Sequence, residues 1–482
     1  MLFNSISYWV FLPVIVCFYF MLKHKYRWVL LLIASYFFYA SWNFSFVIFI
    51  LVSTLVDYWA GLKMGKLPDK NSRKKYLYLS LLVNLGMLFF FKYLGFFNEI
   101  IRSVFGIFDG HYPIDTLDIL LPIGISFYTF QTLSYTIDVY RGNRKPEPHL
   151  GIFALYVSFF PQLVSGPIER SKSFLPQFHK PTTVNWQRII DGGKLIIWGL
   201  FKKMVIADNL SIFIQNVYGS PEEYSGNILL LAMFSVGVQI YCDFSGYTDI
   251  AIGSAKLFGI NLSKNFDRPL FASSMTSLWA KWHISLTRWI RDYMALPLRG
   301  ILKSKVSSYL LLYIVFVSIG LWHGASWQFA VFGVLHATYL AIEKLSFPLR
   351  KVITKATGLD RVPKLKNGLG VLITFTLFAF SGIFFAHDDF DNSLYIISKL
   401  FSGGEIMPYL SKMNFFYPSN VIVILSSLAI FWWIEFNNKT DLRNPFSKIK
   451  SMYLRWATYV IIVFYLIVFK VNENVDFFYF QF

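Results

Sequence analysis

The stretch "YLLLYIVFVSIGLWHGASWQFAVFGVLHATYLAI", residues 309–342, places two long apolar runs on either side of a short junction that contains His323. A helix crosses a bilayer core with about 20 mainly apolar residues, and with fewer where neighbouring protein covers its ends. Both runs meet that requirement together with their flanking residues. An ionisable side chain at membrane depth is costly unless it is paired or functional, so His323, between Trp322 and Gly324, needs an explanation.

The composition of the whole chain agrees with a membrane location. Of its 482 residues, 55% are hydrophobic and only 15% are charged, and the mean hydropathy is +0.50. A soluble domain needs a more highly charged surface, so we expect an all-α polytopic membrane protein with a single domain over residues 1–482. About 11 or 12 transmembrane helices are expected, near residues 6–22, 28–41, 44–60, 76–97, 117–137, 191–207, 228–247, 307–323, 326–343, 370–386, 420–436 and 455–470.

One further apolar run, "GIFALYVSFFPQLVSGPI" at 151–168, is interrupted by Pro161, Gly166 and Pro167 and has basic segments on both sides. Proline and glycine end or bend helices, so we interpret this run as a re-entrant segment that turns back inside the membrane.

The basic residues predict the orientation of the chain. They cluster in seven segments, at 23–27, 63–75, 141–145, 169–190, 248–306, 344–366 and 437–455. These segments hold 37 of the 45 Lys and Arg residues, and the positive-inside rule assigns them to the cytoplasm. Both termini are then external, as are loops near 98–116, 208–226 and 387–419 and the C-terminal residues 472–482. The net charge of +18 therefore implies no nucleic-acid partner.

Several enzyme classes are excluded by the motifs. No GxSxG elbow, Walker phosphate loop, HExxH helix or GxGxxG fingerprint occurs. The two cysteines, Cys17 and Cys242, exclude a disulfide scaffold and a cysteine-based metal site. Cys242 is an alternative acyl-carrying nucleophile, although no basic residue neighbours it in sequence to lower its pKa.

The segment "KWHISLTRWIRDY", 281–293, predicts an amphipathic helix along the cytoplasmic interface. One face carries Trp282, Leu286, Trp289 and Tyr293, and another carries Arg288, Arg291 and Asp292. We place His283 just inside this helix, with an anchoring role and a ligand-binding role equally open. The arginines suit the phosphates of a coenzyme or carrier arm.

"RPLFASSMTSLWAKWHISLTRWIRDY", followed 40 residues later by "GLWHGASWQFAVFGVLHA", resembles the signature of the membrane-bound O-acyltransferase (MBOAT) family. The similarity also covers "LPIGISFYTFQTLSYTIDVYRG", "FFPQLVSGPIER", "GLFKKMVIADNL" and "QIYCDFSGYTDIAIGSAKLFGI", and thus roughly residues 1–390. The chain most resembles the bacterial branch that contains the alginate O-acetylation protein and peptidoglycan O-acetyltransferase. The resemblance implies a family core near 100–390, with interfacial helices around a tunnel.

The resemblance also implies site residues. The histidine of the "WHG" motif, His323, lines the membrane tunnel and is the catalytic residue, and His283 of "WHISLT" is a second important residue. Imidazole suits the role of general base, because its pKa is near neutrality. Residues of the same motifs are candidates for binding the substrate or donor: Trp282, Arg288, Arg291, Asp243, Tyr128 and Gln131. His336 would not share the helical face of His323, and we expect it to pack.

The resembling enzymes carry an acyl group from a cytosolic thioester across the bacterial cytoplasmic membrane toward an external glycan. We therefore expect an acetyl-CoA or acylated-carrier-protein donor, no bound cofactor or metal, and a separate extracytoplasmic acyltransferase as partner. The acceptor polymer stays open, D-alanyl transfer to teichoic acid included. Two other functions stay open as well: an exporter with a proton relay through His323, Asp243 and Asp249, and a scaffold subunit without chemistry.

Overall fold

The computed structural model describes every residue except 109–111, 116, 118, 165, 387–388, 407–417, 438–445, 447–448, 472–476 and 478–482. Within this described part the chain forms helices and no strand, which confirms the all-α prediction. Residue contacts divide the chain into two compact units, Met1–Gly193 with Ala251–Ser263, and Lys194–Ile250 with Lys264–Phe482. A single domain over residues 1–482 stays a prediction.

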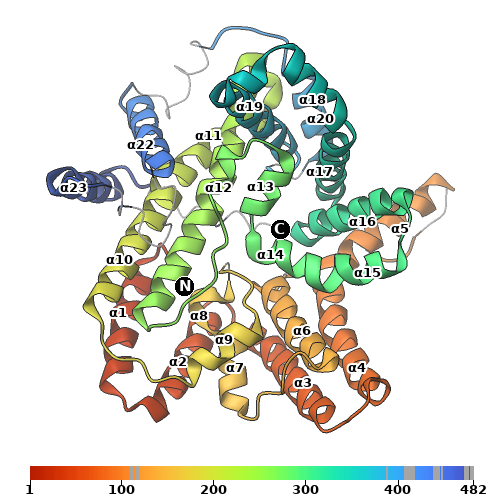
Figure 1. The fold of residues 1–482 in the computed structure, drawn as a ribbon, viewed down its shortest axis with the longest axis vertical. Coiled ribbons are helices and arrows are strands. Elements are labelled where there is room, and N and C mark those ends of the chain that lie inside the picture. The colour runs from red at the N-terminus through yellow and green to blue at the C-terminus, as the bar shows by residue number, and fades with distance from the viewer. Residues whose placement is uncertain are drawn as a thin grey trace. The chain divides into compact units, whose positions relative to one another are not determined.

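The first unit is built from the N-terminal helices, coloured red to yellow in Figure 1. They are α1 (Ile6–Met21), α2 (His24–Ala40), η1 (Phe44–Phe46), α3 (Val47–Gly65), α4 (Lys70–Leu88), η2 (Phe89–Tyr93), α5 (Leu94–Ile107), α6 (Ile125–Arg141), α7 (Leu150–Ser158), α8 (Phe160–Leu163), α9 (Ser171–Phe178) and the start of α10 (Trp186–Leu200).

The second unit contains the later helices and most of the motifs. They are η3 (Phe201–Ala207), α11 (Asp208–Gly219), η4 (Pro221–Glu223), α12 (Gly226–Leu257), η5 (Pro269–Phe271), α13 (Met275–Lys281), α14 (Ile284–Ile290), η6 (Arg291–Ala295), α15 (Leu296–Ile301), α16 (Lys305–His323), α17 (Trp327–Leu345), α18 (Phe347–Ala356), η7 (Leu359–Arg361), α19 (Pro363–Gly382), α20 (Phe390–Lys399), α22 (Pro418–Asn437) and α23 (Met452–Val468). The last seven residues of α12 belong to the first unit.

Each expected span coincides with a helix, and the chain is a polytopic membrane protein. Among the described residues, five helical stretches are long and apolar enough to cross a membrane: Phe44–Gly65, Lys70–Ile107, Gly226–Leu257, Val306–His323 and Pro363–Gly382. Three shorter apolar helices are also found among these residues: Ile6–Met21, Val423–Asn437 and Met452–Val468.

Three boundaries differ from the prediction. The span expected from 117 begins only at Ile125, because Gly124 adopts the left-handed conformation (φ 76°) that L side chains avoid. Residues 98–107, expected as loop, continue the helical stretch from Lys70. Much of the expected loop 208–226 is α11, whose apolar side chains at helical spacing are buried. In the other expected external loops, residues 109–111, 116, 387–388 and 407–417 and nearly all of 472–482 lie outside the described residues, and α20 occupies 390–399.

The run 151–168 is interrupted as expected, because Gly166 and Pro167 lie in irregular backbone after α8 (Phe160–Leu163), and a further break lies at Phe159. Helix α7 ends at Ser158, and Phe159 has a non-helical backbone before α8 begins. Pro161 therefore stands at the start of α8, where its missing N–H costs nothing, and does not end α7. Both short helices are buried.

Polar side chains join the helices of the first unit. Asp57 of α3 accepts hydrogen bonds from Ser80 and Asn84 of α4 and from Thr136 of α6. All four residues are buried, so this network satisfies polar groups that would otherwise be costly. Part of the sequence's buried polarity is thus structural.

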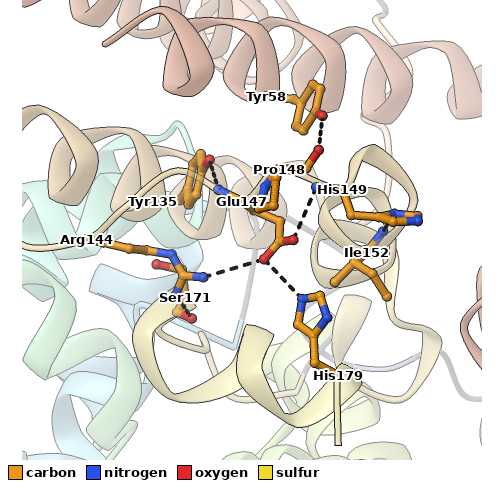
Figure 2. Close-up of polar contacts among 9 residues, drawn as sticks. All are labelled: Tyr58, Tyr135, Arg144, Glu147, Pro148, His149, Ile152, Ser171 and His179. Atoms are coloured by element: carbon orange, nitrogen blue, oxygen red, sulfur yellow. Dashed lines mark hydrogen bonds and ion pairs between the residues drawn. The ribbon is translucent and has the colours of Figure 1, made fainter. Parts of the chain in front are cut away.

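A second polar cluster, shown in Figure 2, holds the loop between α6 and α7. The Glu147 carboxylate lies 3.3 Å from Nε2 of His179 and 3.9 Å from a guanidinium nitrogen of Arg144, and it accepts the His149 N–H at 3.2 Å. The Tyr135 hydroxyl accepts the Glu147 N–H at 3.0 Å. The loop is therefore fixed to both α6 and the end of α9.

Candidate active site

His323 is the last residue of α16, at the turn into α17. The two helices approach closely through glycine: a Cβ at Gly320 would overlap the carbonyl oxygen of Phe329, and one at Gly333 would overlap the backbone of α16. Gly324 is also needed for space, because a Cβ there would overlap the Phe329 ring. The glycine of "WHG" thus allows α17 to pack directly against the residue that follows His323.

The His323 ring is surrounded by aromatic side chains. It is 5% exposed, and its centroid lies 4.9 Å from that of Trp322, 5.0 Å from Phe385 and 6.2 Å from Phe332. These rings hold the imidazole in a low-polarity environment, where hydrogen bonds are electrostatically stronger than in water.

His283 lies at a break between α13 and α14 and not inside a helix. Its φ of 41° is left-handed, which is uncommon for a residue with a side chain and is typical of functional or strained positions. The ring is completely buried, and Nδ1 lies 3.1 Å from Oδ1 of Asn265. Burial lowers the pKa of His283 to about 3, so the imidazole is neutral at physiological pH.

One tryptophan connects the two predicted histidines. Trp322 stands with its ring 5.8 Å from His283 and 4.9 Å from His323, both in edge-on geometry. Phe244 of α12 contacts the other side of His283 at 4.7 Å. The structure therefore brings His283 and His323 into one aromatic cluster within the second unit.

The amphipathic helix expected over 281–293 is wrong in its first residues. Trp282 is the C-cap of α13, His283 follows it in the break, and the helix begins at Ile284. The backbone turns here because Ile284 N–H donates to the Asn265 carbonyl at 2.8 Å instead of continuing the helix.

From Leu286 onward the predicted faces are correct. Leu286 and Trp289 are buried, whereas Arg288 and Arg291 are exposed. Arg291 donates to the neighbouring Asp292 at 2.7 Å. Trp282 packs on Tyr241, Phe266 and Phe378, so its described contacts are core contacts. Donor binding by these residues stays a prediction.

Asp243 is buried in an ionic cluster. Lys203 Nζ of η3 lies 2.7 Å from Oδ1 of Asp243 and 2.7 Å from Oδ1 of Asp208. Removing one partner of a buried charge pair typically costs about 3–5 kcal/mol, because the other charge is left buried and unpaired, so loss of any of these side chains should destabilise the protein. The sequence analysis missed Lys203, although charges inside an expected span were a usable signal.

Asp249 has a similar partner. Lys202 Nζ lies 2.6 Å from Oδ2 of Asp249 and donates to Ser245 Oγ at 2.9 Å. Lys202 and Lys203 are adjacent, and the wider π-helical turn η3 lets both reach α12. The two acids that a proton-relay exporter would use are therefore each ion-paired with a lysine.

Tyr128 and Gln131 belong to the first unit. Tyr128 is completely buried on α6. The Gln131 amide donates to the Tyr156 carbonyl and accepts from Gln162 Nε2 at 2.8 Å. These contacts join α6 to α7 and α8, and a role of either residue toward substrate stays a prediction.

The remaining candidates are placed as follows. His336 is completely buried; its Nδ1 accepts from Trp279 Nε1 at 3.3 Å, and its Nε2 faces Ser381 Oγ at 2.9 Å, as expected of a packing residue.

Cys242 is buried. Among the described residues, no group of three or more His, Cys, Asp or Glu is arranged to hold a metal ion.

Asn265 is the site residue that the sequence did not reveal. It lies in the irregular segment between α12 and η5, completely buried, and contacts both His283 and the first turn of α14. A single polar residue in a loop carries no periodicity, so only the fold brings it to His283.

Comparisons with known proteins show the family to which the chain is similar. The family model described as "MBOAT, membrane-bound O-acyltransferase family" matches residues 30–386. "Probable alginate O-acetylase AlgI" of Pseudomonas aeruginosa is 36% identical over 85% of this chain and 76% of its own length. "Peptidoglycan O-acetyltransferase" of Helicobacter pylori is 32% identical, covering 79% and 75%. "Teichoic acid D-alanyltransferase" of Streptococcus thermophilus is 29% identical, covering 59% and 72%.

Proposed function

The chain belongs to the membrane-bound O-acyltransferase family and is a membrane acyltransferase, and from this premise we propose that it transfers acetyl groups from a cytosolic thioester toward an extracytoplasmic polysaccharide, with His323 as general base. The observation that carries the proposal is the aromatic cluster that joins His323 and His283 through Trp322. The two histidines lie at two helix breaks, one before α14 and one after α16, and both can take part in proton transfer without a nucleotide or metal.

The chemistry follows from the acid–base properties of the groups. A hydroxyl is a poor nucleophile until a base accepts its proton, and imidazole accepts a proton near neutral pH. As the proton leaves, the acceptor oxygen gains alkoxide character and attacks the thioester carbonyl carbon. A new C–O bond forms, the C–S bond breaks, and the proton held by His323 is returned to the leaving thiolate. His283, neutral through burial, is suited to accept or donate a hydrogen bond beside this step.

Acetyl is the acyl group that the similarities favour. The relatives whose names specify O-acetylation share 36% and 32% identity over most of the chain, whereas the named D-alanyl transferase matches a shorter part. Acetyl-CoA is accordingly the proposed donor, with an acylated carrier protein as the second. Alginate-like exopolysaccharide or peptidoglycan is the proposed acceptor, and the bacterial cytoplasmic membrane the proposed location.

The final transfer to polymer requires, in this proposal, a separate extracytoplasmic acyltransferase. Membrane vesicles that contain the chain test this when supplied with radiolabelled acetyl-CoA and purified polymer. We expect thioester consumption by the chain alone, and labelled polymer only when the partner is added. Efficient labelling of polymer by the chain alone would refute the need for a partner. If acetyl-CoA is not consumed but an acylated carrier protein is, the carrier protein and not acetyl-CoA is the donor.

A further inference from the structure

Asn265 accepts three hydrogen bonds from the two residues that follow His283. Its side-chain oxygen Oδ1 accepts the backbone N–H of Ser285 at 3.2 Å and the Ser285 hydroxyl at 2.8 Å. Its main-chain carbonyl accepts the Ile284 N–H at 2.8 Å. The first turn of α14 is therefore fixed to Asn265 by both backbone and side chain.

These contacts determine which way the Asn265 amide points. A backbone N–H can only donate, so the side-chain atom facing Ser285 N must be the oxygen and not the nitrogen. The amide nitrogen Nδ2 then points to Thr248 Oγ1, at 3.5 Å, which is able to accept. Both ends of the amide agree on one orientation.

The same oxygen determines the protonation of His283. Nδ1 of the imidazole lies 3.1 Å from Oδ1 of Asn265, and an amide oxygen has no hydrogen to give. Nδ1 must therefore carry the hydrogen and donate it. In a neutral imidazole the other nitrogen, Nε2, then holds the lone pair, because the tautomer is set by the hydrogen bond that one nitrogen makes.

We propose that Asn265 is a positioning residue of the acyltransferase: it fixes neutral His283 as the Nδ1–H tautomer and makes Nε2 the nitrogen that accepts a proton or hydrogen bond. The inference rests on the proposed function, in which His283 assists His323. The Phe244 ring, edge-on to the imidazole at 4.7 Å, limits rotation of the ring plane. The left-handed backbone of His283 leaves Nδ1 directed at Asn265, which offsets the cost of that conformation.

The first experiment measures the tautomer directly and needs no activity. Solid-state NMR of the membrane-reconstituted protein, labelled with ¹³C,¹⁵N-histidine, distinguishes Nδ1–H from Nε2–H rings. Subtraction of the His283→Ala spectrum identifies the signal of His283. An Nδ1–H signal is expected in the wild type, and an Nε2–H signal would overturn the inference even if the protein is a fully active acyltransferase.

The second experiment measures acyl transfer as a function of pH. Asn265→Leu removes the acceptor and should slow transfer roughly 100-fold, the scale of an acid–base contribution. Asn265→Asp keeps an acceptor but adds a negative charge, so the pKa of His283 should rise by about 1 to 3 units from about 3. The rate should then show an additional fall in that acidic range, at a lower pH than the fall caused by protonation of His323. In a His283→Ala background, Asn265→Asp should produce no such additional fall.

Ser274→Ala is the control for stability. Ser274 caps α13 through the Ser277 N–H and does not contact His283, so its loss should lower the melting temperature with little change in rate per folded molecule. If Asn265→Leu slows transfer no more than Ser274→Ala at equal stability, Asn265 is only structural and the inference fails. A wild-type protein without acyl transfer but with the Nδ1–H signal would instead reject the proposed function alone.

Discussion

At the residue scale, three buried histidines differ in what surrounds them. His283 and His323 share Trp322, whereas His336 uses both ring nitrogens in contacts with Trp279 and Ser381. The sequence separated His336 from His323 through helical spacing alone, and the structure gives the reason. The sequence could not reveal Asn265, because this residue lies in a loop 18 positions before His283 and no sequence pattern marks the contact between them.

A substitution at His336 should therefore affect stability and not chemistry. His336→Leu keeps the volume but leaves the buried Trp279 N–H without its acceptor, a loss of about 1–3 kcal/mol. We expect the thermal midpoint to fall by several degrees while transfer per folded molecule stays near the wild-type value. A stable His336→Leu protein with no activity would contradict the packing role.

His283 should make the protein sensitive to acid. Its folded pKa of about 3 lies below the unfolded value of 6.5, so its contribution to stability is present above pH 6.5 and is lost as pH falls toward 3. The loss approaches about 1.4 kcal/mol per pH unit in that window. Thermal midpoints of the wild type and His283→Asn, compared between pH 7.5 and 4.5, should converge as pH falls, and parallel curves would contradict the buried neutral imidazole.

At the scale of elements, function sits where helices break. The sequence located the break at His323 because Gly324 and the polar junction interrupt an apolar run. It missed the break at Trp282–His283, since aromatic residues continue at helical spacing and neither proline nor glycine occurs there. That turn depends on the distant Asn265 carbonyl, which competes successfully with the helical hydrogen bond. Tertiary contacts therefore determined what local propensity could not.

The glycine contact between α16 and α17 should be essential for placing His323. A Cβ at Gly333 would overlap the backbone of α16, so Gly333→Ala should push the helices apart, lower the melting temperature and reduce transfer. Gly193→Ala is the matched control, because Gly193 lies in α10 with no atom within 4 Å of the new Cβ. That control should be neutral or stabilising by up to about 1 kcal/mol. Equal behaviour of the two variants would argue against the close packing.

At the scale of the whole molecule, hydropathy and charge were the most informative signals. Every expected span contains a helix, because crossing a bilayer imposes length and apolarity directly on the sequence. Helix ends were less predictable: α11 forms where a loop was expected, since its buried face depends on the second unit. The pairing of Lys203 with Asp243 and of Lys202 with Asp249, both acids on α12, could not be predicted either, because it joins residues 40 and 47 positions apart.

The orientation of the chain is testable by cysteine labelling. Glu222 lies in η4 in an exposed, expected external segment, and Lys180 follows α9 in an expected cytoplasmic one. In a protein with Cys17 and Cys242 replaced, Glu222→Cys should react with a membrane-impermeant reagent in intact cells. Lys180→Cys should react only after permeabilisation. The reverse labelling pattern would show that the chain has the opposite orientation in the membrane.

The central claim, that His323 accepts the proton of the attacking hydroxyl, is tested most directly by release of free thiol from acetyl-CoA by the purified protein, with water as the attacking hydroxyl when no other acceptor is supplied. His323→Gln retains size and hydrogen bonding but cannot accept the proton. Because a general base contributes roughly 10²- to 10⁴-fold, we expect His323→Gln to lose at least about 100-fold in rate with an unchanged thermal melt, while His336→Gln stays active. A folded His323→Gln protein that releases thiol at the wild-type rate would contradict the assignment.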